Sequence, residues 1–175
     1  ESAPRELDPR YASDASSTKV TRLLHCALFH VETEDVRPVP EAALSLEPLC
    51  EEGAEGCQHW VVTLRDNIFW HDGVRVTPED VIFTFRSIIG ARRPSPFRGE
   101  LQRKIERIWV KNGKVHFQLR TPYATFPVDL AIGLVPEHIL GLDGGLDGSF
   151  GEEVIGCGPY RFHSRYRDQK IVLER

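Results

Sequence analysis

The segment spanning residues 58–89 carries, within a short distance, the signals for two strands, a tight turn and the start of a helix. Residues 61–65 form a β-branched run that alternates as an antiparallel strand does, and residues 68–70 form a second short apolar run. Asp72-Gly73 ends that run with a dipeptide that tolerates the positive φ of a tight turn. The segment therefore predicts two short strands that lead through a turn into a helix.

The predicted helix start follows the turn directly, and its residues suit a helix N-terminus. Thr77 can cap the free amides, Pro78 fits the first helical position, and Glu79 and Asp80 favour the positive end of the helix dipole. The helix expected over residues 77–89 has one apolar face at helical spacing. That face consists of Val81, Ile82, Phe85, Ile88 and Ile89.

The order of these elements, together with their residues, closely resembles the signature of the family 5 extracellular solute-binding proteins. These are the oligopeptide-, dipeptide- and nickel-binding receptors of ABC importers, and their pattern runs roughly as LR-x-x-x-x-F/W-x-DG-x-x-V-T-x-x-DV-x-F/Y-S/T-F/W. Residues 154–162 resemble a second family segment, V-G-T-G-P-Y-x-F/L, with Cys157 in place of the threonine. The residues in register in the central segment are Leu64, Arg65, Trp70, Asp72, Gly73, Val76, Thr77, Asp80, Val81, Phe83, Thr84 and Phe85.

The resemblance implies an α/β (α+β) fold of the periplasmic-binding-protein-like kind. We expect a lobe with a mixed sheet beside a smaller antiparallel β-sheet lobe with flanking helices, similar to the type II or cluster C receptors. Residues 1–40 and 141–175 would belong to the large cleft-forming lobe, and residues 41–140 to the smaller antiparallel lobe. Because receptors of this family are much longer, we expect the chain to be an amino-terminal fragment and the fold to be incomplete.

The resemblance also implies which residues bind a ligand. In the family, the loop after Leu-Asp-Pro lies in the ligand cleft and pairs its backbone with an extended peptide; the matching residues here are Ser13, Asp14 and Ala15. By themselves these residues also fit a solvent-facing loop before a helix. In the peptide receptors, Ser-Pro followed by an aromatic residue places that ring against the ligand, and Phe97 occupies this position. Phe97 can equally be an anchor that holds its loop on the core.

Other local patterns predict elements on either side of the central segment. One of two serines at the start of residues 16–31 can cap a helix whose apolar residues repeat at spacings of three and four. Asn112-Gly113 stands between two alternating runs, residues 105–110 and 115–119, and is the strongest short-range signal for a β-hairpin. Residues 171–175 match the strand that follows the second family segment.

Charge and apolar content limit the class of partner and the compartment. The formal net charge is −4, so the sequence lacks the broad basic field that favours nucleic acid. No apolar run approaches the roughly 20 residues that span a bilayer. The chain begins at Glu1 and contains no methionine, which indicates either a processed chain or an excised piece of a longer one. We therefore expect a periplasmic or extracellular protein whose signal peptide has been removed, with a membrane-anchored lipoprotein as the alternative.

The cysteines give one predicted disulfide. Cys50 and Cys57 bracket a polar loop that lets them meet, and exported proteins keep such bridges, so we expect this pair to be oxidised. Cys26 and Cys157 have no supporting local spacing. We expect them to be small buried residues, the common fate of an isolated cysteine, although a bridge between them stays open.

The sequence pattern does not predict catalysis or metal binding. His71-Asp72 has no nucleophile beside it, and adjacent residues in a turn point apart. The seven histidines lack the paired spacing of a zinc site. The glycine-rich residues 141–151 lack the Gly-Lys-Ser/Thr of a phosphate loop. We expect no enzyme, no cofactor and no metal.

Taken together, these patterns favour the substrate-binding component of an ABC-type importer. It would bind a peptide, or a related small solute such as a nickel chelate, in a cleft between two lobes and deliver it to a membrane permease. We expect a monomer that does not bind nucleic acid. Without the opposing lobe, we expect these residues to bind peptide feebly or not at all. The alternatives are a ligand-sensing domain of a transcriptional regulator, which a helix-turn-helix upstream would reveal, and a free-standing interaction module without a cleft.

Overall fold

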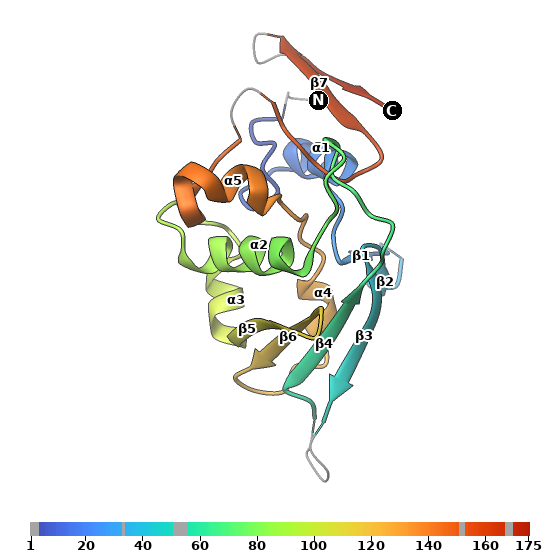
Figure 1. The fold of residues 1–175 in the computed structure, drawn as a ribbon, viewed down its shortest axis with the longest axis vertical. Coiled ribbons are helices and arrows are strands. Elements are labelled where there is room, and N and C mark those ends of the chain that lie inside the picture. Colours follow the sequence, from blue (N-terminus) through green and yellow to red (C-terminus); the bar gives the residue numbers. More distant parts are fainter. Residues whose placement is uncertain (1–3, 33, 51–55, 151–152, 167–169) are drawn as a thin grey trace.

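The computed structural model describes residues 4–32, 34–50, 56–150, 153–166 and 170–175, which form a mixed α/β fold (Figure 1). The strands lie in antiparallel sheets, and the helices are grouped between a four-stranded sheet and a small hairpin. In chain order the elements are α1 (Ala15–Leu24), β1 (Phe29–Val31), β2 (Pro38–Pro40), β3 (Ala43–Leu49), β4 (His59–Leu64), α2 (Pro78–Gly90), α3 (Arg98–Lys104), β5 (Ile105–Lys111), β6 (Lys114–Leu119), α4 (Phe126–Asp129), α5 (Glu137–Gly144), the 3-10 helix η1 (Gly145–Asp147), β7 (Arg161–Tyr166) and β8 (Lys170–Glu174).

The four-stranded sheet has the order β3-β4-β6-β5, with every neighbouring pair antiparallel. Strands β5 and β6 are joined at Asn112-Gly113, where φ is 53° and 70°, as a two-residue hairpin turn of the type I′ kind requires. The predicted hairpin is therefore confirmed. Strands β4 and β6 occupy the centre of the sheet, so backbone hydrogen bonds on both sides hold them in register.

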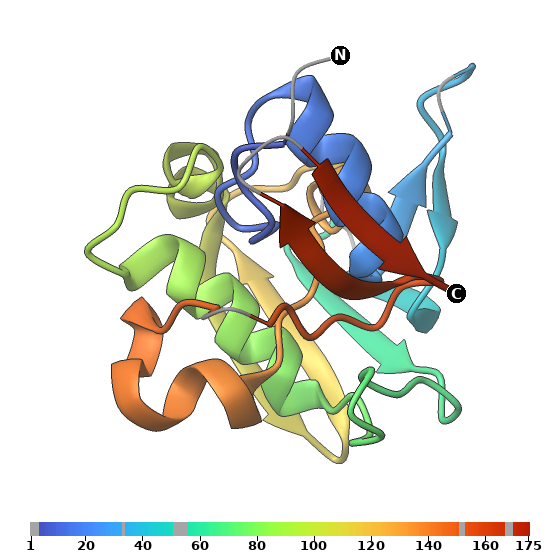
Figure 2. The same cartoon turned by 90° about the horizontal axis from the view of Figure 1, so that it is seen from above.

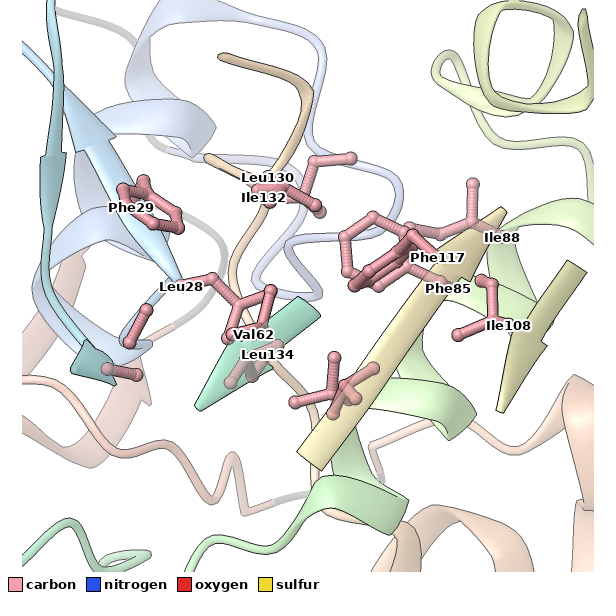
Figure 3. Packing of buried hydrophobic residues seen from close by; sticks show 14 of the residues in the cluster. Leu28, Phe29, Val62, Phe85, Ile88, Ile108, Phe117, Leu130, Ile132 and Leu134 are labelled. Carbon is pink, nitrogen blue, oxygen red and sulfur yellow. The ribbon is translucent and has the colours of Figure 1, made fainter. Parts of the chain in front are cut away.

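Helix α2 begins as the sequence predicts and covers one face of this sheet. Asp80 N donates to Thr77 Oγ1 at 3.4 Å, and Thr77 N donates to Asp80 Oδ2 at 2.8 Å, which forms a capping box around Pro78. Figure 3 shows Phe85 and Ile88 pointing toward the sheet, where Phe85 packs edge-on against Phe117 with ring centroids 5.3 Å apart. This contact lies in the largest apolar cluster of the described residues, which fixes the helix on the sheet.

Helix α1 is shorter than the apolar spacing over residues 16–31 predicts. It ends at Leu24, because the apolar residues beyond that point belong to another element: Leu28 and Phe29 are buried at the start of strand β1. The predicted serine cap was also wrong. Asp14 is the N-cap, and its carboxylate accepts hydrogen bonds from the backbone amide and hydroxyl of Ser17 at 2.9 and 2.6 Å.

The predicted second strand at residues 68–70 was also wrong. Phe69 forms only an isolated antiparallel bridge with Arg75, and Trp70 N donates to Val74 O at 2.7 Å around the turn. The apolar character of this run has a different cause. Trp70 is 2% exposed, and its indole Nε1 donates to Asp80 Oδ2 at 3.2 Å, which anchors the turn to the start of α2.

The structure contains two disulfides. Cys50–Cys57 is present as predicted, with Cα atoms 4.5 Å apart; residues 51–55 between them lie outside the described residues. The prediction that Cys26 and Cys157 are unpaired was wrong. They form a disulfide with Cα atoms 5.1 Å apart and a sequence separation of 131 residues. This bond ties the chain just after α1 to the segment that leads into β7.

The β7–β8 hairpin lies beside α1 at the end of the molecule away from the four-stranded sheet, as Figures 1 and 2 show. A second apolar cluster, which contains Leu7, Leu24 and Val154, joins the amino-terminal residues to this hairpin. The division into lobes at residues 41 and 140 stays a prediction. Among the described helices, none is long and apolar enough to cross a membrane.

Candidate functional site

A groove of about 660 Å³ lies between segments that are far apart in the sequence. One wall is the loop before α1 together with the face of α1 that carries Thr18, Thr21 and Arg22. The other parts come from the loop before α3, strand β1 and the extended segment before α5. The lining residues are Pro9, Ala12, Ser13, Thr18, Thr21, Arg22, His25, Ala27, Phe29, His30, Val31, Glu41, Pro96, Phe97, Ala131, Ile132, Gly133 and Pro159.

The structure brings together two of the four residues that the sequence assigns to ligand binding. Ser13 is exposed and Phe97 is half-buried, and both line the groove. Asp14 does not line it, because its carboxylate is used to cap α1. Ala15 is the first residue of α1 and is also absent from the lining. The four assignments remain predictions, but only Ser13 and Phe97 face a common space.

The loop before α1 is held in place by a buried ion pair. Arg10 has no exposed surface, and its Nη2 lies 2.7 Å from Asp8 Oδ2 and 2.6 Å from the carbonyl oxygen of Gly148. Asp8 Oδ1 also accepts the backbone amide of Arg10 at 3.0 Å. Removing one partner of such a pair leaves an uncompensated buried charge, so the pair fixes the path of the chain that leads to Ser13.

The loop that carries Phe97 is attached to the same amino-terminal segment. Ser95 is buried, and its hydroxyl donates to the carbonyl oxygen of Arg10 at 2.6 Å and accepts the amide of Phe97 at 3.2 Å. Arg93 lies over the ring of Tyr11 with its guanidinium carbon 3.8 Å from the ring centroid. These contacts set the position of Phe97 relative to Ser13, although more than eighty residues separate the two in the sequence.

Groups of both charge signs lie along the groove. Arg22 is exposed on α1, while Glu41 is half-buried between strands β2 and β3. Burial raises the pKa of the Glu41 carboxyl, and the backbone amide of Ala27 and the charge of His30 oppose that rise. A groove with a cationic and an anionic side chain at different places can form ion pairs with both charged ends of a zwitterionic solute.

His25 forms part of the groove floor. Its Nδ1 lies 3.2 Å from the carbonyl oxygen of Leu134, and its Nε2 lies 3.1 Å from that of Leu7. Burial lowers the pKa of His25 to about 4, against the opposing effect of Asp8 and of the two carbonyls. Beside it, a side chain on Gly133 would collide with Pro9, whose Cβ would lie 2.7 Å from the new carbon. A larger residue at position 133 would therefore force Pro9 to shift.

Sequence reasoning missed the charged groups of the groove and the hydroxyl groups that α1 contributes to it. Thr18, Thr21, Arg22 and His25 recur at helical spacing, so one polar face of α1 was visible in the sequence as a signal. Glu41 had no comparable signal, because it reaches the groove through the pairing of β1 with β2.

Comparisons with known proteins agree with the fold. The family model of the bacterial extracellular solute-binding proteins, family 5 middle, matches residues 37–175. Protein XP55 of Streptomyces lividans is 30% identical over 172 residues, which cover 97% of this chain and 30% of that protein. The structure of NikZ from Campylobacter jejuni in complex with Ni(L-His) has a TM-score of 0.78 at 26% identity, covering 95% of this chain and 33% of that one.

The structure of the oligopeptide-binding protein AppA from Bacillus subtilis in complex with a nonapeptide has a TM-score of 0.85 at 24% identity and shows the same fold. It covers 99% of this chain and 34% of AppA. The chain thus spans about a third of the length of the proteins that it matches. The match of the family model to most of its residues shows that the chain belongs to the bacterial extracellular solute-binding proteins of family 5.

Proposed function

We propose that this chain acts in the substrate-binding component of an ABC-type importer, and that its groove is one wall of a solute site. The observation that carries the proposal is that Ser13 and Phe97 line the same groove. Membership of a family of solute-binding proteins supports the role. The second wall would come from an opposing lobe, since the relatives are about three times as long.

The chemistry of the groove favours a peptide or a small solute of similar polarity. Phe97 and Ile132 offer apolar surface for side chains, and the hydroxyl groups of Ser13 and Thr18 can hydrogen-bond to amide groups. Arg22 matches a carboxylate, and Glu41, when ionised, matches an ammonium group or a cationic chelate. The solutes named for the structural relatives, a nonapeptide for AppA and Ni(L-His) for NikZ, fall within these classes.

The remaining parts of the proposal follow from that role. The protein would be a monomer in the periplasm or at the cell exterior and would pass its solute to a membrane permease. Residues 1–40 and 141–175 would build the large lobe, and residues 41–140 the smaller one. Closure of two lobes over the groove would exclude water and strengthen the polar contacts to the solute.

Calorimetry on a protein that joins these residues to an opposing lobe tests the proposal. Short peptides and Ni(L-His) would be titrated into the parent protein and into the Phe97→Ala variant. Because a ring packed against the solute commonly contributes more than 1 kcal/mol, we expect the variant to bind at least about fivefold more weakly.

Phe69→Ala is the matched control, since it removes another partly exposed ring that lies outside the groove. It should leave the affinity unchanged. Equal affinities in the parent protein and both variants would show that Phe97 only anchors its loop, and the assignment of the site would then be wrong.

A further inference from the structure

The face of the four-stranded sheet opposite α2 carries two histidines in direct contact. His59 of β4 and His116 of β6 lie with Nε2 of the first 2.9 Å from Nδ1 of the second. His116 pairs with Val61, so His59 is its diagonal neighbour on the same face. Both residues belong to the central strands, and the backbone ladder fixes the distance between their Cα atoms.

An aromatic residue from the edge strand covers the pair. The indole of Trp109 on β5 stacks on His116 at an interplanar angle of 17°, and its centroid lies 5.2 Å from those of both imidazoles. His116 is 9% exposed, whereas His59 is only half-buried, so solvent reaches the pair from the His59 side. The stacked indole holds the His116 ring beside His59, with the two nitrogens on adjacent edges of the rings.

We propose that His59 and His116 form a two-histidine binding site for a divalent transition-metal ion, with copper(II) preferred. Metal–imidazole bonds are about 2.0–2.1 Å long, so two such bonds that meet at about 90° place their nitrogens roughly 2.9 Å apart. That is the distance between the two facing nitrogens here. An angle near 90° suits neighbouring positions of the square-planar or tetragonal geometry of Cu(II) and Ni(II).

Metal binding needs a lone pair on both facing nitrogens. Without metal, one ring donates an N–H hydrogen bond to the facing nitrogen of the other ring. On metal binding, the proton of that N–H moves to the outer nitrogen of its own ring, so no proton is released.

The neighbouring charges decide which metals bind. Arg107, whose guanidinium carbon lies 5.0 Å from the Trp109 ring centroid, and Lys111 repel a cation. The described residues offer no group of three or more metal-ligating side chains, so water would fill the other positions. Only a metal with strong imidazole bonds overcomes these costs, and the stability order of divalent ions places copper(II) first. Neither histidine lines the groove, so this site does not depend on the proposed solute-binding function.

Titration of the protein with copper(II) at neutral pH tests the proposal. We expect one ion per chain, with two imidazole nitrogens visible in the electron paramagnetic resonance spectrum and with quenching of Trp109 fluorescence. His59→Gln should weaken binding by more than about tenfold, because even partners outside the ligand set cost 10- to 100-fold when lost. His116→Gln should do the same.

His163→Gln is the control, because it removes an exposed imidazole from β7, far from the pair. It should bind copper(II) as the parent protein does. Circular dichroism would show whether each variant is folded, and the half-buried His59 makes His59→Gln the variant least able to disturb the core. Unchanged binding in a folded His59→Gln variant, or no stoichiometric copper(II) in the parent protein, would overturn the proposal.

Discussion

His25 joins two parts of the chain behind the groove. It is 3% exposed, and its ring lies between the carbonyl oxygens of Leu7 and Leu134. A neutral imidazole carries a single N–H and can donate to only one of these carbonyls. Because burial lowers the pKa of His25 to about 4 from its ordinary value of 6.5, the folded protein stays neutral at His25 at pH values where the unfolded chain is already protonated.

This difference predicts a loss of stability on acidification. Between pH 6.5 and 4 the unfolded chain binds a proton at His25 while the folded chain does not, so the free energy of unfolding falls as the pH falls. Below pH 4 both states bind the proton and no further stability is lost at His25. The total loss of unfolding free energy due to His25 is about 3 kcal/mol. Urea denaturation of the parent protein and of His25→Gln at several pH values measures it; parallel pH dependences would contradict the assignment.

At the residue scale, the sequence predicted some of the groove and missed the rest for physical reasons. Ser13 and Phe97 could be named because short segments around them resemble those of the family. Asp14 was also assigned to the ligand, and its carboxylate accepts hydrogen bonds from the amide and the hydroxyl of Ser17 at the start of α1. The partner of Cys26 lies 131 residues away, and local spacing holds no information about so distant a contact.

At the scale of elements, prediction succeeded where the local signals agreed. Helix α2 has a capping box, a proline at its start and a continuous apolar face, and its limits were predicted almost to the residue. Helix α1 was extended too far, because Ala27, Leu28 and Val31 continue its spacing by coincidence. Periodicity alone cannot separate a helix face from a short buried strand that follows it.

The same Gly→Ala substitution can be compared at a turn position with positive φ, Gly113, and at a helical position, Gly99. Gly113 has a φ of 70°, and no atom lies within 4 Å of an added Cβ, so Gly113→Ala tests backbone strain alone. We expect it to lower the free energy of unfolding by about 1 kcal/mol. Gly99 lies in α3 with the same open surroundings, and Gly99→Ala should raise it by about 0.5 kcal/mol. Thermal denaturation distinguishes the two, and shifts of the same sign would contradict this account of the turn.

At the scale of the whole molecule, the two disulfides restrain very different lengths of chain. Cys26–Cys157 spans 131 residues and Cys50–Cys57 spans seven. In the chain-entropy model, the longer loop loses more freedom in the unfolded state. We expect replacement of Cys26 and Cys157 by alanine and threonine to cost about 5 kcal/mol, and replacement of Cys50 and Cys57 by serine about 2 kcal/mol. Guanidinium denaturation measures both; a larger cost for the short loop would contradict the prediction.

Under the proposed function, the groove is one wall of a solute site that a second lobe would complete. With one wall present, a solute in the groove stays exposed on its other side, and its polar contacts compete with water. These residues should therefore bind peptide weakly but at a defined place.

An amide nitrogen–proton NMR spectrum of the chain, titrated with a short peptide to millimolar concentration, tests this most directly. We predict shifts that grow without saturating and that cluster at Ser13, Arg22, Phe97 and Ile132, while Gln118 on the far face of the sheet stays unchanged. Shifts centred elsewhere, no shifts at all, or saturation at micromolar peptide would contradict the claim that the groove is one wall of a two-walled site.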